Sequence, residues 1–230
     1  MHTFNIDHTP AEIVRLFPKA SDLFKENKID FCCGGDKPLR ETLAKKPAIN
    51  EGELLQVLND TYTEWKEEGN KEVDWEQVSR IELIDHIMKE HHQYLHQELD
   101  PLSQFVTKIY RVHGQANPHL RQLHKLYHQF KEDIEAHLVE EETQLFPLVR
   151  RYEDSGDPDL AAKIEVLNKD MEEEHQAAGD LLKEMREITN DFVPPEGACN
   201  SYRITYARLA DLESNTFEHI HLENNILFKS

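Results

Sequence analysis

HLVEEETQLF, residues 137–146, and HIHLENNILF, residues 219–228, are two versions of one pattern. Each begins with a His, places a Glu four residues later and ends in a Leu-Phe pair. Four residues advance an α-helix by about 6 Å and return the chain to nearly the same face, so the His and the Glu of each copy point the same way. The repeat therefore predicts two helices that each present an imidazole and a carboxylate to a common site.

Both copies lie on the apolar stripes of long amphipathic helices. The stripe around the first copy consists of Ile134, His137, Glu141, Leu145 and Leu148. The stripe around the second consists of Leu209, Leu212, Thr216, His219, Glu223 and Leu227. Two further helical patterns each carry a single His on the stripe, His92 after Met88 and His175 after Met171. Four helices thus direct ligand-type side chains toward one core.

This set of side chains predicts a metal site. A buried carboxylate without a partner costs several kcal/mol, and the stripes offer no basic residue to pair with Glu141 or Glu223. Four imidazoles and two carboxylates suit a non-haem di-iron centre better than a structural zinc, which closes at four ligands. We therefore expect two iron ions, bridged by the two carboxylates. The predicted metal ligands are His92, His137, Glu141, His175, His219 and Glu223.

The other histidines of this region are expected beside or opposite the stripes, in ordinary structural roles. They are His86, His91, His96, His113, His119, His124, His128 and His221. His91 and His96 stay open as replacements for His92 if the first helix is rotated or kinked. Among the acidic residues, Glu140, Glu142, Glu172 and Glu173 are expected on a solvated face. Glu174, next to His175, is a candidate either to support a ligand from outside or to line an access path.

Breaks in the patterns predict the domain organisation. Gly and Pro separate four long helices and favour an up-down four-helix bundle over residues 80–230. Residues 1–65 form a predicted small helical domain, with one helix from Pro10 to about Asp22 or Lys25 and another over residues 50–65. Residues 66–79 are charged, weakly patterned and expected to be a linker. The predicted fold class is all-α.

The composition limits the partners. With 26 basic and 45 acidic residues the formal charge is −19, which disfavours nucleic acid and anionic membrane surfaces. The sequence contains no run of 18 uncharged apolar residues, so no membrane span is predicted. The three cysteines make a poor disulfide framework, so we expect a cytoplasmic protein.

Cys32 and Cys33 form a vicinal pair followed by two glycines. A disulfide between neighbours closes a strained ring, and backbone N–H groups of Gly34 and Gly35 are able to lower a thiol pKa or admit a partner. We interpret the pair as redox or transfer thiols, with a packed structural turn as the alternative. Cys199 is expected in a loop or at a helix cap.

IDFCCGGDKPLRE (29–41), EEHQAAG (173–179), PPEGAC (194–199) and HIHLENNILF together resemble the iron-sulfur cluster repair di-iron proteins of bacteria, the ScdA, YtfE and DnrN group. The bundle itself looks like a hemerythrin-like domain. The resemblance implies a stress-response protein that restores clusters damaged by nitric oxide or oxidants. Its expected partners are damaged iron-sulfur proteins and nitric oxide or oxygen as a small ligand, and its expected state is a homodimer.

Two positions depart from oxygen-carrying hemerythrin. Gly179 stands where a second His is expected four residues after His175, and Asn224 stands where an Asp is expected. Fewer ligands leave coordination positions open, which disfavours reversible oxygen carriage. We expect a repair factor that mobilises or donates iron, and favour this over an enzyme. The alternatives are a nitric oxide or peroxide reductase, or an oxygen or redox sensor, built on the same centre. A reductase needs an external electron donor, because the sequence carries no flavin or NAD fingerprint.

Overall fold

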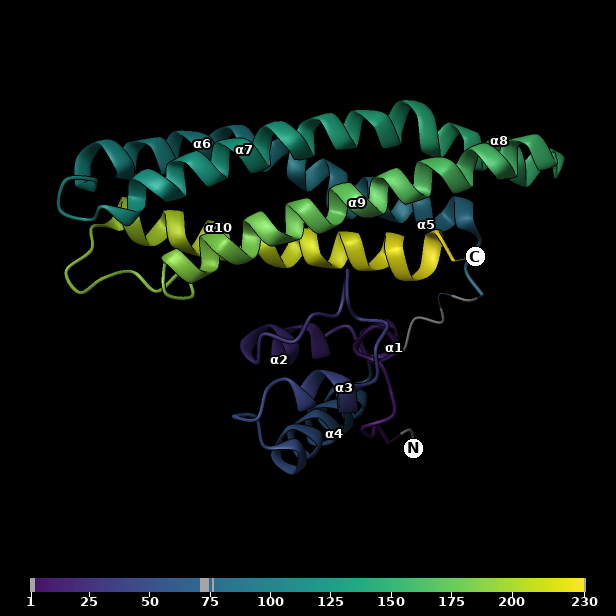
Figure 1. The fold of residues 1–230 in the computed structure, drawn as a ribbon, viewed down its shortest axis with the longest axis horizontal. Helices are drawn as coiled ribbons and strands as arrows, with labels where there is room; N and C mark the ends of the chain where they lie inside the picture. Colours follow the sequence, from purple (N-terminus) through teal and green to yellow (C-terminus); the bar gives the residue numbers. More distant parts are fainter. Residues whose placement is uncertain (1–2, 71–74, 76, 230) are drawn as a thin grey trace. The chain divides into compact units, whose positions relative to one another are not determined.

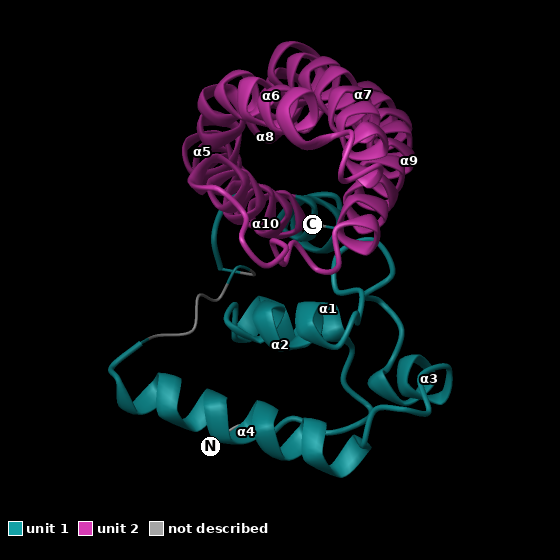
Figure 2. Ribbon diagram, turned by 90° about the vertical axis from the view of Figure 1, so that its left-hand side faces the viewer, with its two compact units in different colours: residues 1–79, 220–230 teal, residues 80–219 magenta. Residues whose placement is uncertain are grey.

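The computed structural model describes residues 3–70, 75 and 77–229. All regular elements in these residues are helices, which confirms the predicted all-α class (Figure 1). Contacts divide the chain into one unit of residues 80–219 and another of residues 1–79 with 220–230 (Figure 2). The boundaries expected from the sequence, 1–65, 66–79 and 80–230, stay predictions, and positions 71–74 and 76 of the expected linker lie outside the described residues.

The bundle is built on the long helices α6, α7, α9 and α10, which run alongside one another (Figure 1). Three of the long helical stretches in the described residues contain a wider π-helical turn, labelled η. The elements in order are α5 (Arg80–Ile87), η1 (Met88–His92), α6 (Gln93–His113), α7 (His119–Glu140), η2 (Glu141–Leu145), α8 (Phe146–Ser155), α9 (Pro158–Ile188), α10 (Asn200–Leu222) and η3 (Glu223–Leu227).

Gly and Pro end and start these helices as the sequence suggests. Gly156 closes α8 in the left-handed conformation, with φ 64°, which glycine adopts at little cost. Asp157 caps α9 by accepting a hydrogen bond from the backbone N–H of Asp159, and Pro158 occupies the first turn. α7 packs against both α6 and α9, and the predicted bundle is confirmed.

The π turn η2 shifts the buried face by one residue, and this corrects one predicted stripe. Leu148, expected in the core, is only half-buried, whereas Phe146 and Val149 are buried. A π turn inserts one residue into the helical repeat, so a stripe drawn at a strict 3.6-residue period passes beside the true core after η2. Met88, the first residue of η1, is also only half-buried.

Apolar layers and a few ionic contacts hold the bundle together. Tyr127 is buried on α7 and donates its hydroxyl to the carbonyl of Leu99 on α6 at 2.6 Å. Arg208 on α10 holds Glu98 on α6, with the closer contact at 2.6 Å. No described helix carries an apolar stretch sufficient to cross a bilayer.

The first unit contains α1 (Pro10–Leu16), α2 (Ala20–Glu26), α3 (Leu39–Ala44) and α4 (Glu51–Glu67). The prediction of one helix from Pro10 to about Asp22 or Lys25 is wrong, because the chain leaves the helix at Phe17, with φ −134° and ψ 83°. Pro18 follows, and the residue before a proline is pushed out of the α region. The expected helix over residues 50–65 is confirmed as α4, with Asn50 as its cap.

Candidate metal centre

Four histidines and two glutamates meet inside the bundle. They form two groups, His92, Glu141, His219 and Glu223, and His137, Glu141, His175 and Glu223. Within each group, one ligand atom from every residue lies within 4.8 Å of the others, and all six side chains are buried. Glu141 and Glu223 belong to both groups, which is consistent with a bridged di-metal centre.

The imidazoles are arranged in two pairs. The Nε2 atoms of His92 and His219 lie 3.2 Å apart, and those of His137 and His175 lie 3.0 Å apart. Two nitrogen ligands about 2.1 Å from one metal and at right angles lie about 3 Å from each other. Each pair is therefore spaced for a single metal ion.

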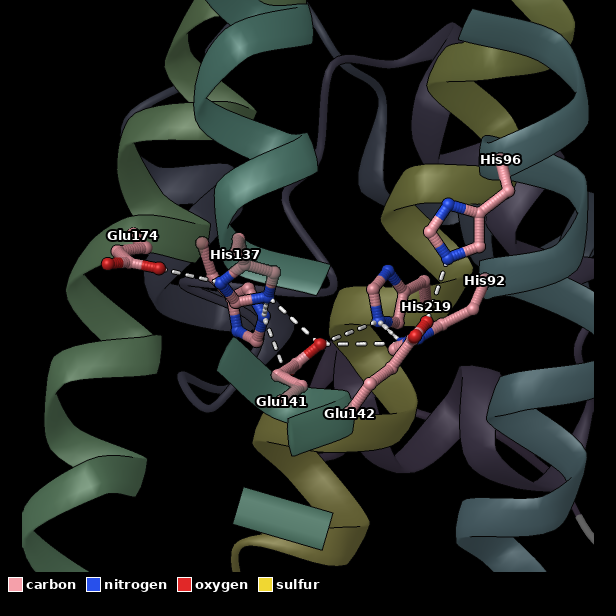
Figure 3. Close-up of polar contacts among 8 residues, drawn as sticks. His92, His96, His137, Glu141, Glu142, Glu174 and His219 are labelled. Carbon is pink, nitrogen blue, oxygen red and sulfur yellow. Dashed lines mark hydrogen bonds and ion pairs between the residues drawn. The ribbon is translucent and has the colours of Figure 1, made fainter. Parts of the chain in front are cut away.

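Glu141 lies between the two pairs (Figure 3). Its Oε2 is 3.4 Å from Nε2 of His92 and 3.2 Å from Nε2 of His137. Among the described residues, neither carboxylate oxygen meets a hydrogen-bond donor in good geometry, although the side chain is fully buried. A buried, undonated carboxylate between two imidazole pairs fits metal ions on both sides.

The charge on Glu141 follows from these neighbours. Burial raises the pKa of this carboxyl group, but the facing imidazoles of His137, His92 and His219 lower it by more, so that its pKa lies well below the usual range. The group is therefore ionised at neutral pH and supplies negative charge to the site.

Two outer carboxylates orient one histidine of each pair. Nδ1 of His92 lies 2.9 Å from Oε1 of Glu142, and Nδ1 of His137 lies 2.7 Å from Oε2 of Glu174 (Figure 3). An ionised carboxylate only accepts hydrogen bonds, so both Nδ1 atoms donate. Nε2 of each ring is then left with its lone pair directed at the metal position.

Both outer carboxylates are ionised. Burial raises the pKa of Glu142, but hydrogen bonds from His96 and His92 bring it below its ordinary value. The hydrogen bond from His137 lowers the pKa of Glu174, against partial burial. The expectation of a solvated role for Glu142 is thus wrong, whereas Glu174 supports a predicted ligand as suggested.

The π turns explain what the sequence patterns missed. η1 ends at His92 and buries His91 as well, whose ring lies nearly parallel to His219, with 5.8 Å between ring centroids. His221, expected beside the stripe, is buried and donates Nδ1–H to the carbonyl of Phe31 at 3.2 Å. Burial lowers the pKa of His221 to about 4, so this ring is neutral. No feature of a regular helical period indicates these contacts.

The cysteine turn is organised by Asp30. Its Oδ1 accepts the backbone N–H groups of Cys32 at 3.0 Å, Cys33 at 3.1 Å and Gly34 at 3.2 Å. The two Sγ atoms are 3.6 Å apart, so both residues are thiols, with Cys32 buried and Cys33 half-buried. A Cβ at Gly35 would come within 2.3 Å of the carbonyl oxygen of Phe31, which requires glycine there.

These contacts use the N–H of Gly34 internally rather than leaving it to a partner. The role of Cys32 and Cys33 as redox or transfer thiols stays a prediction. Cys199 is exposed immediately before α10, where the Nε2 of His113 lies 3.3 Å from its Sγ.

Comparison with known proteins gives two family matches. Residues 83–230 match the Hemerythrin HHE cation binding domain, and residues 6–62 match the ScdA N-terminal domain, described as a domain of unknown function. The chain is 33% identical to the iron-sulfur cluster repair protein ScdA of Staphylococcus epidermidis over 95% of both chains. It is 34% identical to ScdA of Staphylococcus haemolyticus over 95% of both. It is 32% identical to the iron-sulfur cluster repair protein YtfE of Escherichia coli O81 over 96% of this chain and 95% of the relative.

Proposed function

The chain belongs to the family of iron-sulfur cluster repair proteins with a hemerythrin HHE domain, and from this premise we propose that it holds two iron ions and mobilises iron for damaged clusters. The clients are iron-sulfur proteins whose clusters nitric oxide or oxidants have damaged, in the reducing cytoplasm. The observation that carries the proposal is the pair of buried histidine groups that share Glu141 and Glu223.

The donor set favours iron. Each group offers two imidazoles and an oxygen from each of two shared carboxylates. Borderline nitrogen donors together with hard oxygen donors suit iron, whereas the thiolates typical of structural zinc sites do not contribute to either group. When bound, the iron pair supplies exchangeable ferrous ions and a redox couple.

The chain's own residues hold and orient this centre. Glu142 and Glu174 keep His92 and His137 in the tautomer that presents Nε2 inward. Four protein donors for each ion leave coordination positions for exchangeable ligands. Gly179 is buried on α9 one turn after His175 and brings no further donor to that side. A centre held in this way is suited to delivery.

A second candidate function uses the same open positions. Nitric oxide, peroxide or oxygen could coordinate there, which is the basis for a reductase or a sensor. The glycine at position 179, in place of a histidine, is the observation that favours it. The two candidates differ in the fate of the iron, which a reductase retains and a donor loses.

The test follows both iron and repair. Purified protein loaded with iron is mixed with a [4Fe–4S] enzyme that nitric oxide has inactivated, and enzyme activity and protein-bound iron are measured together. We expect reactivation with a matching loss of iron from the repair protein. Turnover of nitric oxide with the iron retained would favour the reductase, and absence of reactivation would contradict repair by iron donation.

Matched histidine variants connect this activity to the site. His219→Ala removes a predicted ligand of one group, and it should lower the iron content to about one weakly held ion per chain and abolish reactivation. His128→Ala removes a half-buried histidine of α7 that contacts Thr107 and should preserve both. Full iron and full repair in His219→Ala would contradict the site assignment.

A further inference from the structure

The two outer carboxylates of the metal centre are held unequally. Oε1 of Glu142 lies 2.9 Å from Nδ1 of His92 and also 2.9 Å from Nε2 of His96. Figure 3 shows Glu142 reaching toward both rings. This carboxylate therefore accepts two hydrogen bonds, one from a ligand and one from a histidine on the next turn of the same helical stretch.

Glu174 accepts a hydrogen bond from one histidine side chain, that of His137. Its Oε2 lies 2.7 Å from Nδ1 of His137, and no second side-chain contact is found for it in the described part of the chain. Its side chain is 47% exposed, against 26% for Glu142. Glu174 can therefore rotate into solvent by breaking one hydrogen bond, whereas Glu142 must break two.

Glu142 occupies the position beside the predicted bridging ligand. Glu141 and Glu142 are the first two residues of η2. The first of these carboxylates lies at the metal centre, and the second reaches η1 and α6 from outside the histidine ligand. One turn of η2 thereby supplies both a predicted bridging ligand and the support of His92.

We propose that Glu142, fixed by His96, is a positioning residue that retains the metal of the His92–His219 group, so that the His137–His175 group releases its metal first. The inference rests on the proposed function, because it identifies which of two iron ions is delivered first. The metal concerned is ferrous iron.

The physical reason lies in how a histidine ligand leaves. Nε2 separates from the metal only when the ring turns, and turning breaks the Nδ1 hydrogen bond behind it. His96, whose side chain is 48% exposed, donates a second hydrogen bond to Glu142, so the acceptor behind His92 has less rotational freedom than the acceptor behind His137. His137 is held by a carboxylate that solvent reaches.

Iron release to a chelator tests the proposal. Protein carrying two ferrous ions is mixed anaerobically with excess bipyridyl, and the coloured complex is followed over time. We expect a fast and a slow phase of similar amplitude. Glu174→Ala should accelerate the fast phase about 10- to 100-fold, as expected on loss of an outer hydrogen-bond partner, and leave the slow phase unchanged. Glu142→Ala should accelerate the slow phase by a similar factor.

Control variants separate this effect from lost charge or lost stability. Glu140→Ala and Glu173→Ala each remove an acidic side chain from the same helical stretches and should leave both phases unchanged. Glu142→Gln, which keeps an oxygen acceptor, should give an intermediate rate. Melting temperatures of the metal-free proteins should agree, since a merely structural defect would lower them and accelerate both phases.

The outcomes are distinct from those of the repair assay. Acceleration of the fast phase by Glu142→Ala, equal effects of both variants on both phases, or release of both ions in one phase would overturn the proposal. Each result concerns retention alone and stands whether or not the iron repairs a cluster. Failure of reactivation with normal biphasic release would contradict the proposed function and leave the asymmetry intact.

Discussion

The His92–His219 group and the His137–His175 group contain the same ligand types and share both carboxylates, yet their surroundings differ. Behind His92 stands a carboxylate held by a second histidine, and behind His137 stands one that is nearly half exposed. His92 is the last residue of η1, and His137 and His219 each stand four residues before the first residue of a π turn, whereas His175 lies in the unbroken helix α9. Identical donors therefore need not give identical sites.

The sequence repeat supplies ligands to both groups. The two His-Glu copies predict a common site in which both carboxylates bridge the two metal ions. In the structure, His137 and His219 belong to different groups, whereas Glu141 and Glu223 belong to both. The repeat thus distributes one imidazole to each metal position and shares its carboxylates between them.

The largest expected effect comes from a shared carboxylate. Glu141→Gln removes charge from both groups at once, so we expect loss of both iron ions, measured by metal analysis. Iron at a thousandfold excess over its Kd should stabilise the wild-type fold by about 4 kcal/mol and the variant by far less. Chemical unfolding with and without iron measures this difference.

The metal-free proteins should differ much less. Without iron, the facing imidazoles stabilise the ionised Glu141 and hold its pKa well below the usual range, so Glu141→Gln should be somewhat less stable than the wild type. A variant that keeps two iron ions, or that loses stability only in the metal-free state, would argue against a bridging role.

Removing one histidine ligand should affect mainly the metal ion of the group to which that histidine belongs. His175→Ala is expected to lower the iron content from about two to about one ion per chain, because only one group contains this imidazole. His219→Ala acts on the other group, which is the more strongly supported one, and we expect the remaining iron to be released rapidly. Iron content after gel filtration and the rate of chelation check both expectations.

If the iron ion that remains in His175→Ala and the one that remains in His219→Ala are released at the same rate, the two groups do not differ in metal retention. Equal release rates would mean that the outer carboxylates do not differentiate them.

A smaller effect is expected at the anchor of Glu142. His96→Ala leaves every predicted ligand in place but removes one of the two hydrogen bonds to Glu142. Reordering a long side chain costs about 1 kcal/mol, so the slow phase of iron release should accelerate about five-fold. His128→Ala is the matched histidine control, and an unchanged slow phase in His96→Ala would show that the anchor is irrelevant to retention.

Substitutions in the cysteine turn are expected to have the smallest effect on metal binding. Neither thiol belongs to the two metal groups, so Cys32→Ala and Cys33→Ala should retain two iron ions and both release phases. If the thiols act in transfer, these variants should reactivate a damaged enzyme more slowly while releasing iron to bipyridyl normally. Loss of iron in either variant would place the thiols at the metal instead.

Much of the architecture followed from sequence patterns. Alternating apolar stripes with Gly and Pro breaks predict the long helices, because helix burial repeats at a fixed period. Glu141 and Glu223 were recognisable as site residues because acidic groups in a core require compensation. The same reasoning placed His92 on the stripe, although Met88 on that stripe is only half-buried.

The outer side chains were not predictable in the same way. Glu142 follows Glu141 directly, and on a regular helix two successive residues diverge by about 100°, so it was expected to face solvent. Its contact with His92 depends on the π turn and on the approach of η1, which no local pattern records. For the same reason the burial of His91 and His221 could be seen only in the folded chain.

Magnetic Mössbauer spectroscopy of protein loaded with enriched iron, combined with metal analysis, tests the central claim most directly. Carboxylates shared between two metal positions predict two iron ions per chain that are exchange-coupled, with a diamagnetic ground state when both are ferric. One iron ion per chain, or two ions that behave as independent magnetic centres, would contradict the account.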